Sequence, residues 1–273
     1  MEMIGMVASL VLVGLFVGVC SGLLGIGGGT LIVPILRLGF GLDAYMATAT
    51  SLFSIIFTSL SGAGTHLRNK TCIPQLGLAL GIGGAFTSAA GVALANVSPS
   101  WAIMLVAAII IAYSAYNMLK KALKMPKAGN AAKPKEACAP GVEDGFAVTR
   151  KVVACGFGIG LIAGLASGYV GVGGGFIMVP LMTTWLGVPM KKASGTSLIA
   201  IIILAIPGVI GHALLGHIDY LAGILIVVGS VPGAVIGARL VTKIPERSLR
   251  FLFAGFLLVA AIALVLNEFG ILG

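Results

Sequence analysis

Apolar residues occupy most of the chain in long runs, and the polar stretches lie between these runs. A run of about 18 or more apolar residues is long enough to cross a bilayer as a helix. The pattern predicts an all-α polytopic membrane protein with about eight to ten membrane helical segments. The segments are 4–25, 28–38, 45–65, 73–95 and 101–119, then 152–171, 174–186, 193–211, 220–241 and 249–269.

The same pattern occurs twice along the chain. Residues 21–94 match residues 167–240 without a gap, at a shift of 146 positions, and the match pairs Pro34 with Pro180. Such internal duplication is typical of secondary transporters. We therefore divide the chain into three parts. They are a first membrane repeat at 1–119, a polar and basic linker at 120–151, and a second membrane repeat at 152–273.

Each repeat carries a glycine-rich run between two apolar segments. The runs read SGLLGIGGGTLIVP at 21–34 and SGYVGVGGGFIMVP at 167–180. Close helix packing accounts for scattered glycines, but three adjacent glycines do not lie on one helix face. Irregular backbone persists in a membrane only where it is buried in protein or lines a wet cavity. A helix that restarts after the glycines directs its free N–H groups and positive dipole end at the break, which predicts an anion site.

The 17 Lys and Arg residues discriminate between one broken span and a hairpin at each glycine run. Cytoplasmic loops are enriched in basic residues. With the linker inside, the hairpin leaves only Arg37 outside and 16 basic residues in the cytoplasm, whereas the broken span leaves seven outside. We therefore predict glycine-broken helical hairpins, a cytoplasmic linker and both termini outside. The two halves are then inverted-topology repeats, related by a pseudo-two-fold axis in the membrane plane.

The candidate substrate-binding groups are the glycines of both runs and four hydroxyls at the start of the next helix in each half. These hydroxyls either bind an oxyanion together with the glycine backbone or are satisfied by carbonyls of their own helix. The candidates are Gly25, Gly27, Gly28, Gly29, Thr50 and Ser51 in the first half, and Gly171, Gly173, Gly174, Gly175, Thr196 and Ser197 in the second.

Three histidines lie near helix ends. His66 and His212 occupy matching positions in the two halves, at opposite membrane faces in the predicted topology. They are interpreted as interfacial caps or as gating or proton-handling groups. His217 has no histidine counterpart and is assigned no role.

Composition argues against several other classes. With 59% hydrophobic and 9% charged residues, the chain is not a soluble domain, so its net charge of +9 reflects loop residues rather than a nucleic-acid surface. The spans hold no HExxH motif, paired carboxylates or Ser-His-Asp set, and the four cysteines form no CxxC pair, so no enzyme, cofactor or metal is predicted. All eight acidic residues lie at ends or connections, which favours anion export along the membrane potential over carboxylate-coupled uptake.

The sequences SGLLGIGGGTLIVPIL and SGYVGVGGGFIMVPLM, followed by ATSL and GTSL respectively, resemble the sulfite exporter TauE/SafE family of membrane permeases. The resemblance covers the chain apart from the linker. It implies a carrier of sulfur-containing anions, such as sulfite, thiosulfate or organosulfonates, in the inner membrane of a bacterium or archaeon. It also implies that the glycine runs and the four hydroxyls are the binding elements.

The resemblance leaves the substrate and the mechanism open. No Arg lies within an apolar segment to bind a sulfonate, unless Arg37 or Arg239 reaches inward from a helix end. The hairpins could support alternating access or line a gated anion pore, and another small organic anion could be the cargo. The predicted partners are the small anionic substrate and the lipid bilayer, and the oligomeric state, including a homo-oligomer, stays open.

Overall fold

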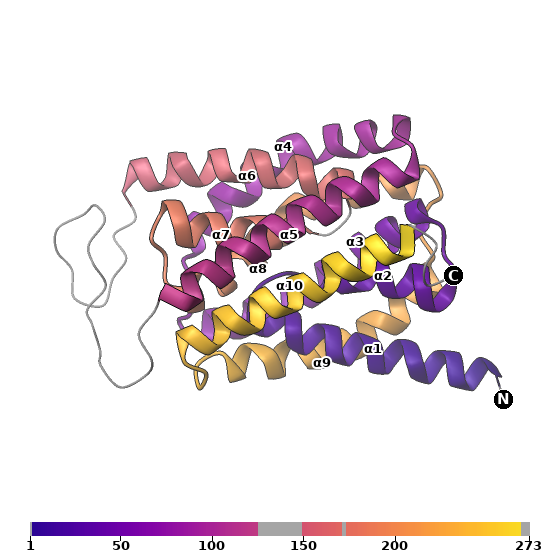
Figure 1. Cartoon of the computed structure of the whole chain (residues 1–273), viewed down its shortest axis with the longest axis horizontal. Coiled ribbons are helices and arrows are strands. Elements are labelled where there is room, and N and C mark those ends of the chain that lie inside the picture. The colour runs from indigo at the N-terminus through magenta and orange to yellow at the C-terminus, as the bar shows by residue number, and fades with distance from the viewer. Residues whose placement is uncertain (1, 125–148, 171–172, 269–273) are drawn as a thin grey trace.

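The structure is a computed structural model that describes residues 2–124, 149–170 and 173–268. These residues form ten α-helices and no β-strand, which confirms the all-α class (Figure 1). Most of the predicted linker lies outside the described residues. The first half contains α1 (Glu2–Leu24), α2 (Gly29–Phe40), α3 (Ala44–Arg68), α4 (Pro74–Val97) and α5 (Ser100–Lys124). The second half contains α6 (Arg150–Val170), α7 (Gly175–Trp185), α8 (Met190–Leu214), α9 (Tyr220–Leu240) and α10 (Glu246–Glu268).

Short polar signals set where the long helices begin. The Asp43 side chain accepts a hydrogen bond from the Tyr45 N–H at the start of α3, and Asp219 accepts one from the Ala222 N–H at the start of α9. An aspartate at this position satisfies a backbone donor that the helix leaves unpaired. α10 begins at Glu246, three residues before the predicted start, because an acidic first turn suits the helix dipole.

Seven of the described helices are long and apolar enough to cross a membrane, namely α1, α3, α4, α5, α6, α8 and α9. Helices α2 and α7 have 12 and 11 residues. At about 1.5 Å per residue each is about half as long as the ~30 Å hydrocarbon core. Large apolar side chains such as Phe86, Val97 and Leu214 are exposed on the outside, as expected of a surface that faces lipid.

Each half packs its first helix on the fourth helix of the other half. α1 lies along α9, and α6 lies along α4. Glycines permit the close approach: a Cβ on Gly18 of α1 would lie 2.2 Å from the Ser230 carbonyl oxygen, and one on Gly164 of α6 would lie 2.1 Å from that of Gly84. Close helix packing thus explains these glycines, as the sequence indicated for those outside the two runs.

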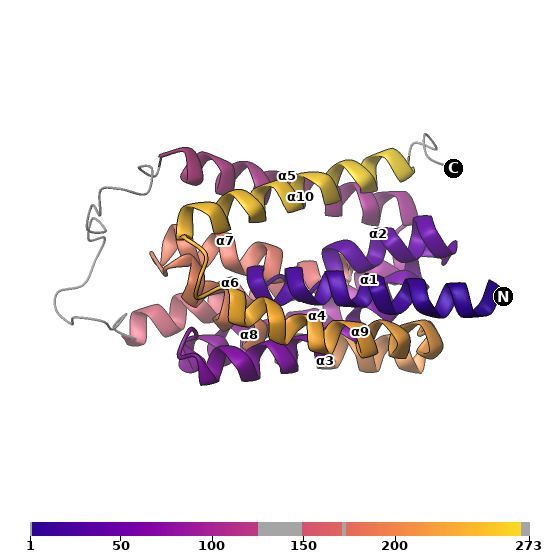
Figure 2. The ribbon, with the colours of Figure 1, turned by 90° about the horizontal axis from the view of Figure 1, so that it is seen from below.

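The other long helices complete the bundle. α3 and α8 pack against each other at its centre, and α5 packs against α10. In Figure 2, α5 and α10 form a layer over the rest of the molecule. The start of α1 and the end of α10 lie at one end of the bundle, and the end of α5 and the start of α6 lie at the other (Figure 1). This arrangement is what inverted repeats require, but the inverted relation stays a prediction because it also depends on where the membrane plane lies.

Candidate functional site

The first glycine run is a tight turn between α1 and α2. Gly25, Gly27 and Gly28 have φ values of 72°, 80° and 92°, which only glycine adopts without strain. Gly28 is the N-cap of α2, and its carbonyl oxygen accepts hydrogen bonds from the N–H groups of Leu31 and Ile32. A Cβ on Gly28 would lie 2.7 Å from Val17 Cγ1, so the start of α2 folds back against α1 as a hairpin.

The second glycine run repeats this geometry. Gly173 and Gly174 have φ values of 84° and 69°, Gly174 is the N-cap of α7, and Gly175 is its first residue. Gly171, which the sequence also assigned to the site, lies outside the described residues. Both short helices therefore begin at a glycine in the left-handed region.

The two turns meet at the centre of the molecule. A Cβ on Gly175 would lie 2.5 Å from the Gly25 carbonyl oxygen, so only glycine fits at this crossing. Added Cβ atoms on Gly27 and Gly173 would both contact the side chains of Ile55 on α3 and Ile201 on α8. Both isoleucines are fully buried. We call the glycine turns and these two isoleucines the glycine junction.

Of the four predicted hydroxyls, Ser197 is at the glycine junction. Its Oγ donates a hydrogen bond to the Gly25 carbonyl oxygen at 2.6 Å. Its counterpart Ser51 is also fully buried. Thr50 and Thr196 bond elsewhere, since Thr50 accepts from the Asp219 N–H at 3.0 Å and Thr196 accepts from that of Ile73 at 2.9 Å. These two threonines hold the connections before α9 and α4.

Three hydroxyls at the glycine junction were not assigned from the sequence. Ser21, Ser167 and Thr30 are fully buried, and their oxygens have no hydrogen-bond partner among the described residues. Ser21 Cβ lies 3.7 Å from a Cβ built on Gly28, and Ser167 Cβ lies 3.5 Å from one built on Gly174. Buried hydroxyls normally find a partner. The sequence did contain one indication of their importance, because Ser21 and Ser167 are the first residues of the two matching runs.

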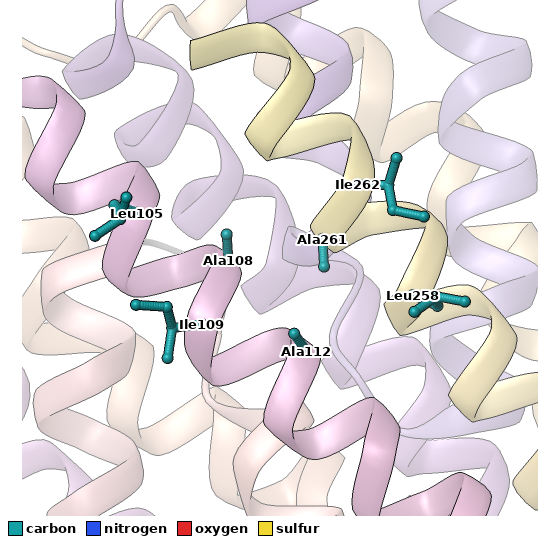
Figure 3. A pocket seen from close by; sticks show the side chains of 7 residues that line it. All are labelled: Leu105, Ala108, Ile109, Ala112, Leu258, Ala261 and Ile262. Carbon is teal, nitrogen blue, oxygen red and sulfur yellow. The ribbon is translucent and has the colours of Figure 1, made fainter. Parts of the chain in front are cut away.

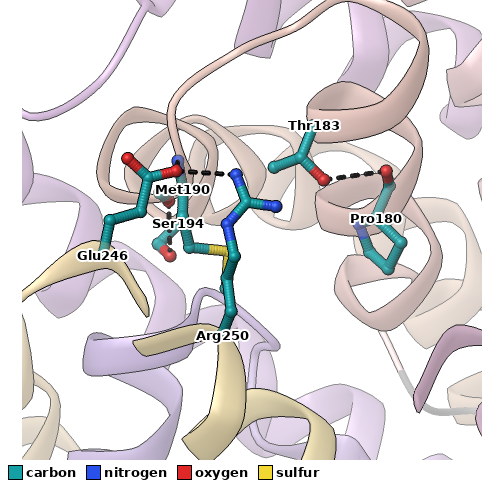
Figure 4. A network of polar contacts seen from close by, with 6 residues as sticks. All are labelled: Pro180, Thr183, Met190, Ser194, Glu246 and Arg250. Atoms are coloured by element: carbon teal, nitrogen blue, oxygen red, sulfur yellow. Dashed lines mark hydrogen bonds and ion pairs between the residues drawn. The ribbon is translucent and has the colours of Figure 1, made fainter. Parts of the chain in front are cut away.

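The buried guanidinium belongs to Arg250 on α10. Figure 4 shows its Nη2 directed at Glu246, to which it donates a hydrogen bond of 2.6 Å. The same Glu246 oxygen accepts from the Met190 N–H at 3.1 Å, so this ion pair ties α10 to the start of α8. Of the arginines named from the sequence, Arg239 is exposed and Arg37 is partly buried.

The two matching histidines differ in their surroundings. Nε2–H of His66 donates to the Gly22 carbonyl oxygen at 2.8 Å, and Nδ1 lies 2.8 Å from the Thr71 hydroxyl. His212 is equally buried, but both of its ring nitrogens lack a hydrogen-bond partner among the described residues. The His217 ring lies 6.0 Å from the His212 ring and 5.8 Å from that of Tyr45 at the start of α3. The end of α8 therefore lies beside the start of α3, which places His66 and His212 at opposite ends of the bundle.

An apolar cavity lies apart from the glycine junction. It has a volume of about 350 Å³ between α5 and α10, and Figure 3 shows its aliphatic lining. Leu105 and Ile109 line one side, and Leu258 and Ile262 line the other. Such a lining suits hydrocarbon rather than an anion. Within the described ranges, no group of three or more His, Cys, Asp or Glu side chains could hold a metal ion.

Comparison with known proteins agrees with this architecture. The family model described as "Sulfite exporter TauE/SafE" matches residues 10–264. The chain is 30% identical to the probable membrane transporter protein YdhB of Bacillus subtilis over 87% of this chain and 91% of that protein. It is 29% identical to YunE of the same species, also named a probable membrane transporter protein, over 88% and 90% of the two chains.

A plant protein matches over a shorter stretch. Sulfite exporter TauE/SafE family protein 3 of Arabidopsis thaliana is 35% identical over 45% of this chain and 26% of its own length. No solved structure matches the chain. The family match over nearly the whole chain, the transporter names and the apolar helices lead to one conclusion. The chain is a multi-pass membrane protein that belongs to the sulfite exporter TauE/SafE family.

Proposed function

We propose that the protein is a secondary transporter that exports small sulfur-containing anions, such as sulfite, thiosulfate or organosulfonates, across the inner membrane. The substrate binds at the glycine junction, and access alternates between the two ends of the bundle around the two hairpins. The linker lies in the cytoplasm, and both termini lie outside. The sulfur chemistry rests on the family description, and the site rests on the geometry below.

The observation that carries the proposal is the convergence of two helix N-termini at one buried point. α2 and α7 both start at the glycine junction, where Gly175 lies against the Gly25 carbonyl oxygen. Each helix N-terminus contributes about half a positive charge and several N–H groups without intrahelical partners. Together they supply the positive potential for an oxyanion without a Lys or Arg side chain.

The unpartnered hydroxyls give the glycine junction a second means of recognition. Ser21, Ser167 and Thr30 are buried donors without a hydrogen-bond partner in the part of the chain that the structure describes. An unsatisfied buried hydroxyl carries a desolvation cost that a ligand oxygen would relieve. A tetrahedral or pyramidal oxyanion offers several acceptor oxygens, so it could engage both short helices at once.

The closed junction favours alternating access over an open path. Ile55 and Ile201 fill the space between the two glycine turns, and neither is exposed. An anion could enter only if a hairpin moves relative to α3 and α8, and motion of the other hairpin would open the opposite end. The membrane potential of a cell that is negative inside favours anion exit by about 2.3 kcal/mol per charge per 100 mV.

Flux measurements in proteoliposomes test this proposal. The protein is reconstituted and its transport of labelled sulfite, thiosulfate, sulfoacetate and sulfate is measured, with Gly174→Ala compared with Gly187→Ala. Gly174 and Gly187 have nearly equal φ values of 69° and 67°, but only Gly174 lies at the glycine junction. Both variants carry similar backbone strain, whereas only the Cβ of Gly174→Ala would approach a neighbouring helix, at 3.1 Å from the Ala163 carbonyl oxygen.

We expect saturable flux that Gly174→Ala lowers at least tenfold, which corresponds to about 1.4 kcal/mol, while Gly187→Ala keeps it. Equal flux in the two variants would contradict the proposed site. A gated pore makes a different prediction, because it would pass macroscopic current and would not show saturable exchange of labelled substrate.

A further inference from the structure

The two ends of the bundle differ at one pair of matching positions. His66 of the first half matches His212 of the second, and Thr71 matches His217. Thr71 is a hydrogen-bond partner of His66, whereas His212 has a second imidazole at the equivalent place. The otherwise repeated sequence thus provides a His–Thr pair at one end and a His–His pair at the other.

At the first end, the neutral ring of His66 is fully satisfied. A carbonyl oxygen only accepts, so the 2.8 Å contact with Gly22 fixes the proton on Nε2. Nδ1 is then the acceptor for the Thr71 hydroxyl at 2.8 Å. This arrangement gives both ring nitrogens of the neutral form a partner.

At the second end, three ring nitrogens have no partner among the described residues. They are both nitrogens of His212 and Nδ1 of His217. The ring centroids are 6.0 Å apart, so the rings must approach each other by roughly 1 Å as they rotate before two nitrogens reach hydrogen-bond distance. His212 is fully buried and His217 is partly exposed, so His217 connects the inner ring to solvent. Buried polar groups without partners are costly, which makes such a cluster unusual unless it binds something.

The ionisable groups around this pair carry both signs. Helix α4, which also packs against α8, contains no ionisable side chain in its range Pro74–Val97. The Asp219 side chain caps α9 two residues after His217, and Asp43 caps α3 two residues before Tyr45. The ionisable residues of the segments at this end are Glu2, Arg37, Asp43, Tyr45, Tyr169, Asp219, Tyr220 and Glu268.

We propose that His212 and His217 together form a proton-binding site at the end of the bundle where α3 and α9 begin. A proton from solvent reaches His217 and is shared between the lone pairs of the two rings, which converts unpartnered nitrogens into an N–H···N contact. The added positive charge attracts anions to this end of the transport path. The proton site stands independently of the proposed function, whereas its effect on flux rests on that function.

Histidine NMR tests the site without any substrate. The chain has only three histidines, so ¹⁵N-histidine labelling of the full-length protein, purified with a tag free of histidine, gives a spectrum that single His→Gln variants assign. In nanodiscs between pH 3.5 and 8.5, we expect protonation to change the His212 and His217 signals together. Coupled groups report macroscopic steps that belong to the pair.

Two exchanged variants serve as matched controls. His217→Thr gives His212 the threonine that His66 has at the matching position, and we expect it to move the His212 titration by about one pH unit or more or to abolish it. Thr71→His copies the pair into the first half and should make His66 titrate. The proposal is overturned if His212 does not titrate in the wild type, or if His217→Thr leaves its titration unchanged.

Flux then tests the effect on transport. Thiosulfate is the probe, because its charge is constant between pH 6 and 8. The protonated fraction of an ordinary imidazole falls about 25-fold over this range, which is the upper limit of the expected decrease in wild-type flux. His217→Thr should flatten the pH profile. If the histidine pair titrates but no tested anion is transported, the proton site stands and the result counts against the proposed function. If an anion is transported but the pair does not titrate, only the proton site is overturned.

Discussion

At the scale of single residues, two buried serine side chains distinguish the glycine junction. Ser21 and Ser167 occupy matching positions, are buried, and have no hydrogen-bond partner among the described residues. Ser197 differs, because it donates to the Gly25 carbonyl oxygen and to that of Ser194, and so supports the turn itself. Substitution should therefore separate binding from stability at Ser21 and Ser167 but not at Ser197.

The double variant Ser21→Ala/Ser167→Ala tests this distinction. Because no hydrogen bond is lost, the thermal midpoint should stay the same or rise, while KM for the transported anion rises about tenfold or more. Measurements are thermal unfolding in detergent and flux in proteoliposomes. Ser88→Ala is the matched control, since Ser88 on α4 is also buried without a hydrogen-bond partner among the described residues but lies against Gly208 on α8. Unchanged KM in the double variant would rule out substrate contact by these two hydroxyls.

At the scale of helices, glycine has two separate functions in this chain. In α1, α6 and their partners it removes side chains so that two backbones touch, as at Gly164 and Gly84. At Gly28 and Gly174 it provides positive φ, which stops one helix and starts another in the opposite sense. The first use stabilises the bundle, and the second creates the proposed site.

Helix contact can be probed separately from the site. A Cβ on Gly164 of α6 would lie 2.1 Å from the Gly84 carbonyl oxygen, so Gly164→Ala should lower stability by about 1–3 kcal/mol. Gly158→Ala on the same helix is the control, because no atom lies within 4 Å of the added Cβ. Thermal unfolding monitored by circular dichroism measures both. Equal midpoints for the two variants would contradict the close contact between α6 and α4.

At the scale of the whole molecule, the contacts collect basic residues at one end. Lys191 donates a hydrogen bond to the Thr242 carbonyl oxygen, and Asn69 donates one to that of Ala238. These contacts place the start of α8 beside the ends of α9 and α3. Arg68 and Arg239 belong to the last turns of α3 and α9 at this end. Arg37, at the end of α2, belongs to the opposite end. This segregation supports the proposal that the linker end faces the cytoplasm.

Thiol labelling tests that orientation. In single-cysteine variants that retain Cys72 or Cys138, an impermeant maleimide should label inverted membrane vesicles and not intact cells. Cys138 lies outside the described residues, whereas Cys72 lies in the connection between α3 and α4, where burial raises the pKa of its thiol. Its thiolate is therefore scarce near neutral pH, and its labelling should quicken about tenfold per pH unit below that pKa. Labelling of Cys138 on intact cells would reverse the proposed topology.

The amino-acid pattern alone predicted the all-α class, about eight to ten membrane segments and their approximate ends, because apolar run length, glycine and proline act locally, and the distribution of basic residues favoured the two hairpins. The duplicated runs also indicated the proposed site, since three adjacent glycines do not lie on one helix face. By contrast, the sequence pattern did not predict that Arg250 is buried, because Arg250 lies at the start of an apolar run. The packing of α10 against α8 buries it beside Glu246.

Tertiary structure decided which matching residues share a role and which do not. Thr50 accepts a hydrogen bond from the connection before α9. Ser197, which matches the neighbouring Ser51 in the other half, instead donates a hydrogen bond to the Gly25 carbonyl oxygen. His66 and His212 match in sequence but differ in hydrogen bonding, because their partners come from α1 and from residues five positions further along the chain. Sequence shows which groups are present and repeated. Contacts between distant segments set which of those groups have a hydrogen-bond partner among the described residues and which do not.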